Sequence, residues 1–376
     1  MELSARYKRI IRVTALATAG ALAVTGGFVW LNGMNDRELG RACGGMLSVD
    51  DIRAVLGDDH LDVKTGSRDG TDWCAVTAGD RGAKVTVVDT TRIGTDTRRL
   101  SLDAVPFAQA SAHGMLSVPV GHGWSGLFAM DDTDAEAGEA TTTLTLTCGK
   151  ASEKSSAGGK RIKGLAVTVA ADLDTNLDDP ATRPAYVRIA TSTAAKAAKA
   201  YGCVTHLGDR TVRTVGLPVT EDEFEPLAKT SGTCAAVPTT TDVTTARETA
   251  RAGAPTETCL LADDGLGNDR YSLQADFGPY AAQLKAGYEQ ERYSSDPTPA
   301  DATTGQLLDD KGYWGSAECP AEGERAVFRV ALTGESANSG DRRRPTAPEL
   351  AYARRALRAF AEHSAKTHGC SAPTTP

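Results

Sequence analysis

Hydrophobic and polar positions follow two patterns along this chain, and both patterns occur twice in the same order. An apolar strand-like run at 164–169 is followed by a loop and then by apolar side chains every three or four residues, from Pro184 to Tyr201. The same succession leads from 326–330 to a second periodic stretch that begins near Pro348. Short apolar runs are typical of strands, and a spacing of three to four is typical of amphipathic helices. The pattern therefore predicts a strand, a loop and a long helix in each half of the chain.

Both periodic stretches stop at a Gly-Cys pair, at Gly202 and at Gly369. Glycine is favoured just after a helix because the chain often turns there through a left-handed conformation. Each half also carries four cysteines in the same order: Cys43, Cys74, Cys148 and Cys203, then Cys234, Cys259, Cys319 and Cys370. Between the second and third cysteine, each half has an aromatic-glycine stretch, at 121–126 and at 311–316. We therefore expect two homologous domains.

Shorter elements complete the expected domains. Apolar spacing and capping residues predict helices from Ser48 to Leu56, over 98–112, over 241–251 and from Pro279 to Tyr288. The expected fold class is α+β, with an N-terminal transmembrane helix and two tandem domains, each an antiparallel sheet packed by helices and held by two disulfides. The expected segments are 1–12 cytoplasmic and basic, 13–31 transmembrane signal-anchor, 32–42 juxtamembrane linker, 43–203 first repeat, 204–233 connector, 234–370 second repeat and 371–376 disordered tail.

The N-terminus carries a basic cluster followed by an uncharged stretch over 13–31. As a helix this stretch would measure roughly 28 Å, close to the thickness of a bilayer core. Basic residues stay on the cytoplasmic side, so the bulk of the chain is expected outside the cytoplasm, as part of a single-pass cell-membrane protein. A cleaved secretory signal ending near Ala23 is the alternative. A lipid anchor on Cys43 is disfavoured because Glu38 and Arg41 stand where a lipobox needs apolar and small residues.

Eight cysteines, four in each half, favour disulfides in an oxidising compartment. Three pairings are open within each half, and loop entropy does not choose among them because it varies only with the logarithm of loop length. Since each half divides into an N-terminal and a C-terminal part, we favour Cys43–Cys74, Cys148–Cys203, Cys234–Cys259 and Cys319–Cys370.

The net charge of −8 gives little support to nucleic-acid binding, because an acidic surface repels phosphate backbones. One short basic run, Arg342 to Arg344, could contact anionic lipid or a wall polymer, but a solvated loop is the favoured interpretation.

Candidate chemistry is sparse. His122 and Ser125 lie close in sequence and suggest a serine hydrolase, but no G-x-S-x-G motif is present, and Lys311 stands near the position of His122 in the second half. The acidic stretch 131–136 has its glycine misplaced for a calcium loop, and Asp58 to His60 is expected to be an exposed loop.

His206 and His368 could bind zinc only beside reduced thiols, because a thiol engaged in a disulfide cannot ligate the metal. We therefore expect no catalytic residue, no cofactor and no metal ligand.

The run from Cys43 to Ile52, followed by Trp73-Cys74, resembles the opening of small secreted or lipoprotein domains in actinobacterial (streptomycete-like) cell-envelope proteins of unassigned function. In those domains a cysteine ahead of a helix faces a cysteine on the next strand. The likeness covers residues 43–76 well and the second half of the chain only loosely. Because this chain lacks a lipobox, the resemblance does not imply lipidation. The resemblance implies an α+β sandwich and supplies no catalytic residues.

These observations favour a non-enzymatic, membrane-anchored envelope protein whose duplicated domains bind a protein, a peptide or a cell-wall component. The partners expected are that unknown envelope component and the membrane, through 13–31, with no nucleic acid. An extracytoplasmic hydrolase using His122 and Ser125, and a structural accessory subunit of a membrane complex, are the alternatives.

Overall fold

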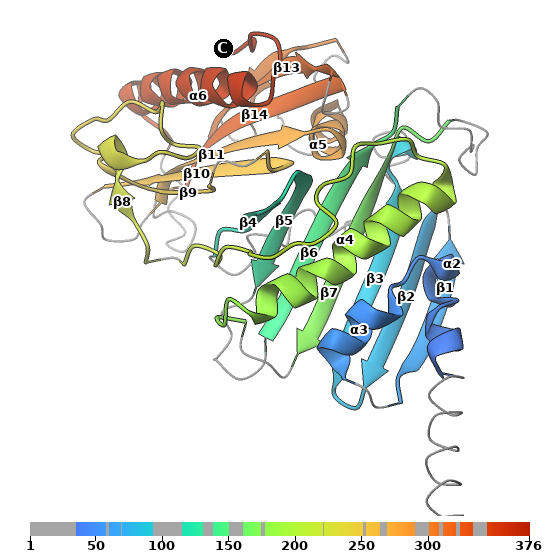
Figure 1. The fold of residues 1–376 in the computed structure, drawn as a ribbon. Coiled ribbons are helices and arrows are strands. Elements are labelled where there is room, and N and C mark those ends of the chain that lie inside the picture. The colour runs from blue at the N-terminus through green and yellow to red at the C-terminus, as the bar shows by residue number, and fades with distance from the viewer. Residues whose placement is uncertain are drawn as a thin grey trace, which may run out of the picture.

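A computed structural model describes the chain over residues 35–57, 60–68, 70–92, 115–130, 138–149, 161–173, 177–220, 222–250, 253–263, 269–289, 301–307, 311–320, 324–333 and 344–376. These residues form two domains, each built on a seven-stranded antiparallel sheet (Figure 1). One long helix lies across a face of each sheet, α4 in the first domain and α6 in the second.

The first sheet has the strand order β1-β2-β3-β7-β6-β5-β4. Its strands are β1 Asp62–Arg68, β2 Thr71–Ala78, β3 Arg81–Asp89, β4 Val118–Gly121, β5 Trp124–Met130, β6 Gly138–Thr147 and β7 Gly164–Leu173. Its helices are α2 Ala42–Gly45, α3 Val49–Leu56, the 3-10 turn η1 Thr90–Arg92 and α4 Thr182–Tyr201. The apolar stripe of α4, including Val187, Ala190 and Ala194, is fully buried in the core of this domain together with Val167 and Val169 of β7.

The second sheet has the strand order β12-β13-β14-β11-β10-β9-β8. Its strands are β8 Glu225–Pro226, β9 Thr245–Glu248, β10 Thr256–Ala262, β11 Asp269–Phe277, β12 Thr304–Gln306, β13 Gly312–Cys319 and β14 Glu324–Leu332. Its helices are the 3-10 turn η4 Leu227–Lys229, α5 Pro279–Glu289 and α6 Ala347–Thr367. Helix α6 begins with a capping box between Thr346 and Glu349, and Leu357 and Phe360 of its apolar face are buried in the core.

The four central strands of the two sheets share their order and their register. Across β2, β3, β7 and β6, the first sheet aligns Cys74, Val85, Val169 and Thr142. Across β10, β11, β14 and β13, the second sheet aligns Cys259, Leu273, Val330 and Tyr313. The last residue of each alignment, Thr142 or Tyr313, lies six positions before the next cysteine of its domain, Cys148 or Cys319. The same core of four strands therefore occurs twice.

Four disulfides hold these cores, and they join the pairs that the sequence favoured: Cys43–Cys74, Cys148–Cys203, Cys234–Cys259 and Cys319–Cys370. The last cysteine of each domain follows a glycine with a positive φ of 65°, Gly202 or Gly369, which turns the chain away from the end of the long helix. The helix endings predicted from the Gly-Cys pairs are thereby confirmed.

The predicted fold class, α+β with a transmembrane helix, is wrong. The described residues form two antiparallel sheets with few helices, and none of the helices in this part of the chain is long and apolar enough to cross a bilayer. The segments expected as helices over 13–31 and 98–112 lie outside the described residues. Part of the segment expected as a helix over 241–251 forms β9 instead, because all four residues of that strand pair with the edge of β10. The helices expected at Ser48 and at Pro279 are present as α3 and α5.

The two aromatic-glycine stretches are not equivalent, contrary to our expectation. Gly121 and Gly123 form the β4–β5 turn with positive φ values of 69° and 76°. In the second domain residues 312–316 of the stretch lie inside β13, whose counterpart by register is β6. Gly315 is needed there because a Cβ atom would lie 2.3 Å from the Thr374 carbonyl oxygen. Glycine is therefore required by a tight turn in the first domain and by the close approach of another backbone segment in the second.

The C-terminal residues 371–376 are not the disordered tail that we expected. Thr374 exchanges backbone hydrogen bonds of 2.9 and 3.1 Å with Ser316 on β13, and the Ser371 N–H donates to the Glu318 carbonyl at 2.8 Å. In the first domain the position equivalent to Ser316 is Thr145, which contacts Ser125 of β5. The tail therefore covers the edge of β13 at a place that β5 covers in the first domain.

Candidate functional site

A pocket of about 450 Å³ lies between the two domains, within the size range of small-ligand sites. Three parts of the chain build it. The first domain contributes residues of β5 and β6, and the connector contributes the segment after Cys203. The second domain contributes the residue before β10, the end of β11 and the start of α5. The lining of the pocket includes Trp124, Ser125, Thr145, Thr147, Gly149, Val204, Thr205, His206, Pro255, Phe277, Gly278 and Pro279.

The Cys148–Cys203 disulfide positions one wall of this pocket. Thr147 and Gly149 flank Cys148 along the chain, and Val204, Thr205 and His206 follow Cys203 directly. The Gly149 N–H donates to the Val204 carbonyl at 2.7 Å, so the two segments run side by side beyond the bridge. The covalent bond thus fixes the connector against the end of β6.

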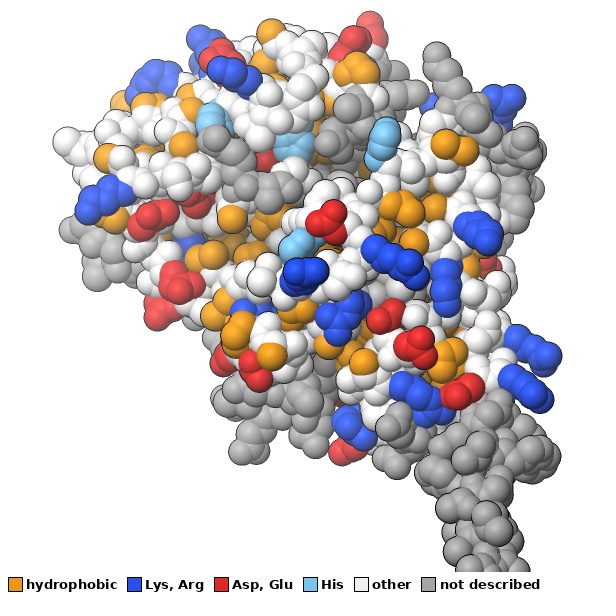
Figure 2. Space-filling view, viewed as in Figure 1, with side chains coloured by type: hydrophobic (Ala, Val, Ile, Leu, Met, Phe, Trp, Pro, Cys, Tyr) orange, Lys and Arg blue, Asp and Glu red, His pale blue; other side chains and the backbone are white. Residues whose placement is uncertain are grey.

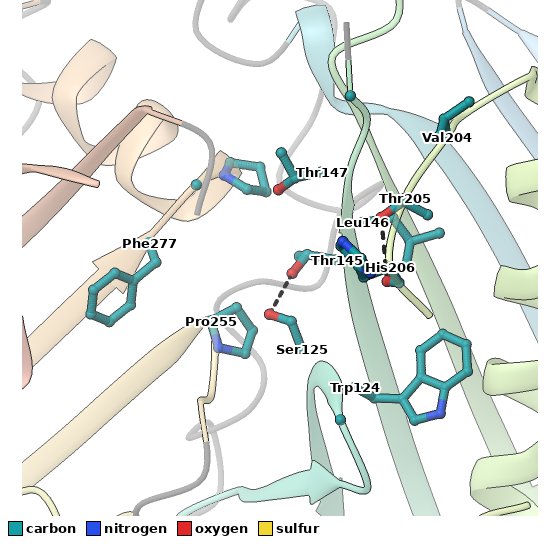
Figure 3. A pocket seen from close by; sticks show the side chains of 14 residues that line it. Trp124, Ser125, Thr145, Leu146, Thr147, Val204, Thr205, His206, Pro255 and Phe277 are labelled. Carbon is teal, nitrogen blue, oxygen red and sulfur yellow. Dashed lines mark hydrogen bonds between the residues drawn. The ribbon is translucent and has the colours of Figure 1, made fainter. Parts of the chain in front are cut away.

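Hydroxyl groups form the polar part of the wall. Ser125 on β5 and Thr145 on β6 face each other in the middle of the pocket, with their oxygens 3.1 Å apart (Figure 3). Both side chains are partly exposed, and Thr147 is exposed. Each hydroxyl can donate and accept, so this wall can hydrogen-bond to either kind of polar group on a ligand.

The aromatic rings at the pocket are already engaged by the protein. Trp124 is 4% exposed, and its indole N–H donates to the Asp209 carbonyl at 3.0 Å. Phe277 is 1% exposed, and its ring stacks on His368 with the centroids 3.7 Å apart. Both rings lie at the sides of the pocket rather than across it (Figure 3).

The described residues that line the pocket include no Asp, Glu, Lys or Arg. His206 is the titratable side chain among them, and it is exposed on the connector. A ligand with a strong charge would therefore find no fixed counter-charge in this lining, and burial of an unpaired charge is costly.

The structure does not bring His122 and Ser125 into a hydrogen bond. His122 lies at the β4–β5 turn, and its Nε2 is 2.9 Å from the Thr214 carbonyl oxygen while its Nδ1 is 3.8 Å from an Asp209 carboxylate oxygen. Ser125 instead contacts Thr145. The histidine therefore ties the hairpin to the connector, and the two residues lack the base-to-nucleophile contact that serine hydrolysis needs.

The metal candidates are dispersed. Within the described ranges, no group of three or more His, Cys, Asp or Glu side chains is arranged to hold a metal ion. His206 lines the pocket, but the neighbouring Cys203 is engaged in a disulfide. His60 lies 3.9 Å from Asp62 at an exposed site.

Other sequence candidates fall outside the described residues: the acidic stretch 131–136, Asp58, Asp59, Arg342 and Arg343.

One buried polar group was not anticipated. Glu257 on β10 accepts hydrogen bonds from Ser364 of α6 and from His368, just after that helix. Because His368 also stacks on Phe277, this group supports the strand end that leads into the pocket. No local pattern marks these residues, since Glu257 and His368 are 111 positions apart.

Comparisons of this chain with protein-family models, curated proteins and solved structures found no match. The resemblance to actinobacterial envelope proteins therefore stays a prediction.

Proposed function

We propose that this chain is a non-enzymatic extracytoplasmic binding protein that holds a peptide or a cell-wall fragment in the pocket between its two domains. The observation that carries this proposal is the origin of the lining, which comes from both domains and from the connector. Pockets at domain junctions are common ligand sites, because a ligand there can contact several rigid elements at once.

The disulfides support an extracytoplasmic location. All eight cysteines are engaged in bridges, and such bridges persist in oxidising environments outside the cytoplasm. Each of the four bridges has at least one buried cysteine, so the bridges are parts of the two cores. A rigid pair of cores suits a binding protein, because a preformed site loses little entropy when the ligand enters.

Native mass spectrometry of the full chain tests the proposal. The protein is incubated with a mixture of extracellular peptides and with a mixture of soluble peptidoglycan fragments, and we expect a retained adduct from one of them. In a Thr147→Trp variant the exposed lining residue becomes a bulky ring that obstructs the pocket, so adduct formation should be strongly reduced.

Thr77→Trp is the matched control, since Thr77 is also an exposed strand threonine of the first domain but does not line the pocket. The proposal fails if no adduct forms, or if Thr147→Trp retains it as well as Thr77→Trp does.

A further inference from the structure

We infer that the ligand of this pocket is an uncharged peptide segment with apolar side chains, rather than a glycan. This inference rests on the proposed function and names the ligand class of the same site. Four observations on the lining and its surroundings support it.

The charge of the lining disfavours ionic ligands. No Asp, Glu, Lys or Arg occurs among the described lining residues, so neither a basic peptide nor an acidic wall polymer would find a partner there. The chain as a whole carries a net charge of −8, which adds a long-range repulsion of polyanions.

The hydroxyl wall fits a peptide backbone. Ser125 and Thr145 come from neighbouring strands, and Thr147 lies two residues further along β6. Alternate residues of a strand point to the same side, so Thr145 and Thr147 present their hydroxyls on one face. Amide N–H and carbonyl groups alternate along an extended peptide, and hydroxyls can pair with both.

The aromatic rings argue against a sugar. A sugar ring packs best on the open face of an aromatic side chain, because that face is a broad apolar surface. Trp124 and Phe277 do not offer such a face, since both are buried and Phe277 already stacks on His368. The polar wall therefore lacks the platform that a glycan would use.

Apolar side chains continue from the pocket along the connector. Val204 lines the pocket and is 59% exposed, and Leu207, directly after the lining residue His206, is 43% exposed. Hydrophobic side chains are visible on the surface along the junction between the two domains (Figure 2). Exposed apolar groups that adjoin a pocket mark a contact surface, and here they suit the side chains of a bound peptide.

Two probe sets test this inference with the full, immobilised chain. One is a library of N-acetylated, C-amidated pentapeptides that includes charged and uncharged members, and the other is a set of soluble N-acetylglucosamine oligomers. We expect retention of uncharged peptides that carry Leu, Val or Phe, and no retention of the oligomers. The Kd of a recovered peptide is then measured by fluorescence anisotropy.

Two pairs of variants locate the binding. The double change Ser125→Ala, Thr145→Val removes both hydroxyls while nearly keeping side-chain volume, and should raise the Kd at least about fivefold. Its control is Thr143→Val on the same strand, where the hydroxyl pairs with Thr168 and does not line the pocket. Leu207→Ser should raise the Kd, whereas Leu217→Ser, equally exposed at 42% but away from the lining, should leave it unchanged.

The outcomes separate the two proposals. Retention of the oligomers without the peptides, or a preference for charged peptides, overturns the peptide inference but leaves the binding function. Retention of neither set counts against both. Binding that is insensitive to the Ser125/Thr145 and Leu207 changes places the peptide elsewhere and overturns the inference for this pocket.

Discussion

The Nε2 atom of His368 lies 2.9 Å from an oxygen of the Glu257 carboxylate, and the two side chains are 1% and 2% exposed. The contact joins the end of α6 to β10, and the imidazole stacks on Phe277 of β11 at the same time. Glu257 also accepts a hydrogen bond from Ser364, so both of its oxygens are engaged. Such a group stabilises the fold only while all its members are present, because each is buried away from water.

Removal of the carboxylate should therefore destabilise the second domain. Glu257→Ala leaves His368 and Ser364 buried without their acceptor, and we expect a loss of about 3 kcal/mol in the free energy of unfolding. Urea unfolding followed by circular dichroism measures this. Glu362→Ala, at an exposed position of α6, is the control and should change stability by less than about 0.5 kcal/mol. Equal effects of the two changes would contradict the role given to Glu257.

Tyr186 should make the first domain sensitive to alkali. Its hydroxyl is fully buried, 2.7 Å from the Ala140 carbonyl oxygen and 2.6 Å from that of Val169, and burial raises its pKa above the ordinary value of 10.0. The folded state therefore retains this proton after the unfolded chain has lost it. Its stabilisation is complete below about pH 10 and falls as the pH rises further, by about 1.4 kcal/mol per pH unit for one such group.

Tyr186→Phe tests the assignment. The variant should lose about 1–2 kcal/mol at pH 7, because two carbonyl groups lose a buried partner. Above pH 10 its stability should fall less steeply than that of the unaltered protein. Identical slopes in the two proteins would show that other groups govern alkaline unfolding.

Two disulfides have their second cysteine just after a long helix, α4 or α6. Comparing variants of these two bridges separates an effect on ligand binding from an effect on stability. Cys148–Cys203 closes a loop of 55 residues and Cys319–Cys370 one of 51, so loss of either should cost about 4 kcal/mol in the chain-entropy account. Only the first bridge adjoins pocket residues. Replacing its cysteines with serine should weaken ligand binding well beyond the effect of the same change at the second bridge.

The Kd of a recovered peptide is measured for both double-serine variants by fluorescence anisotropy. The measurement is made at a low temperature at which circular dichroism shows that each variant is folded. A similar loss of affinity in the two would mean that the connector keeps its place without the covalent bond.

The C-terminal tail should protect the edge of β13. Ending the chain after Cys370 removes the backbone hydrogen bonds of Ser371 and Thr374 and leaves that part of the edge unpaired. We expect a loss of about 1–3 kcal/mol in stability and more self-association, because open edges pair with other chains. Thr374→Pro, which removes one N–H donor, should give a smaller loss. Sedimentation velocity and urea unfolding measure the two effects.

Local sequence was informative where the physical cause is local. The glycines at the ends of α4 and α6 follow from the backbone conformation that a helix end requires. Local sequence was misleading where pairing with a neighbouring strand decides the conformation. Over 241–251 a helix was expected, but residues of this segment pair with β10 and form β9. The aromatic-glycine stretches look alike because glycine serves both turns and close contacts.

The sequence by itself determined that the chain has two similar halves, each held by paired cysteines, because cysteine order and the glycines that end helices can be recognised in short stretches of chain. Only the tertiary structure decided that Ser125 contacts Thr145 rather than His122, that Glu257 meets His368, and that Val204 to His206 close a pocket against Pro255 and Pro279. These contacts depend on sheet register and on how one domain lies against the other. Both are set by the packing of residues far apart in the chain, which no local pattern records.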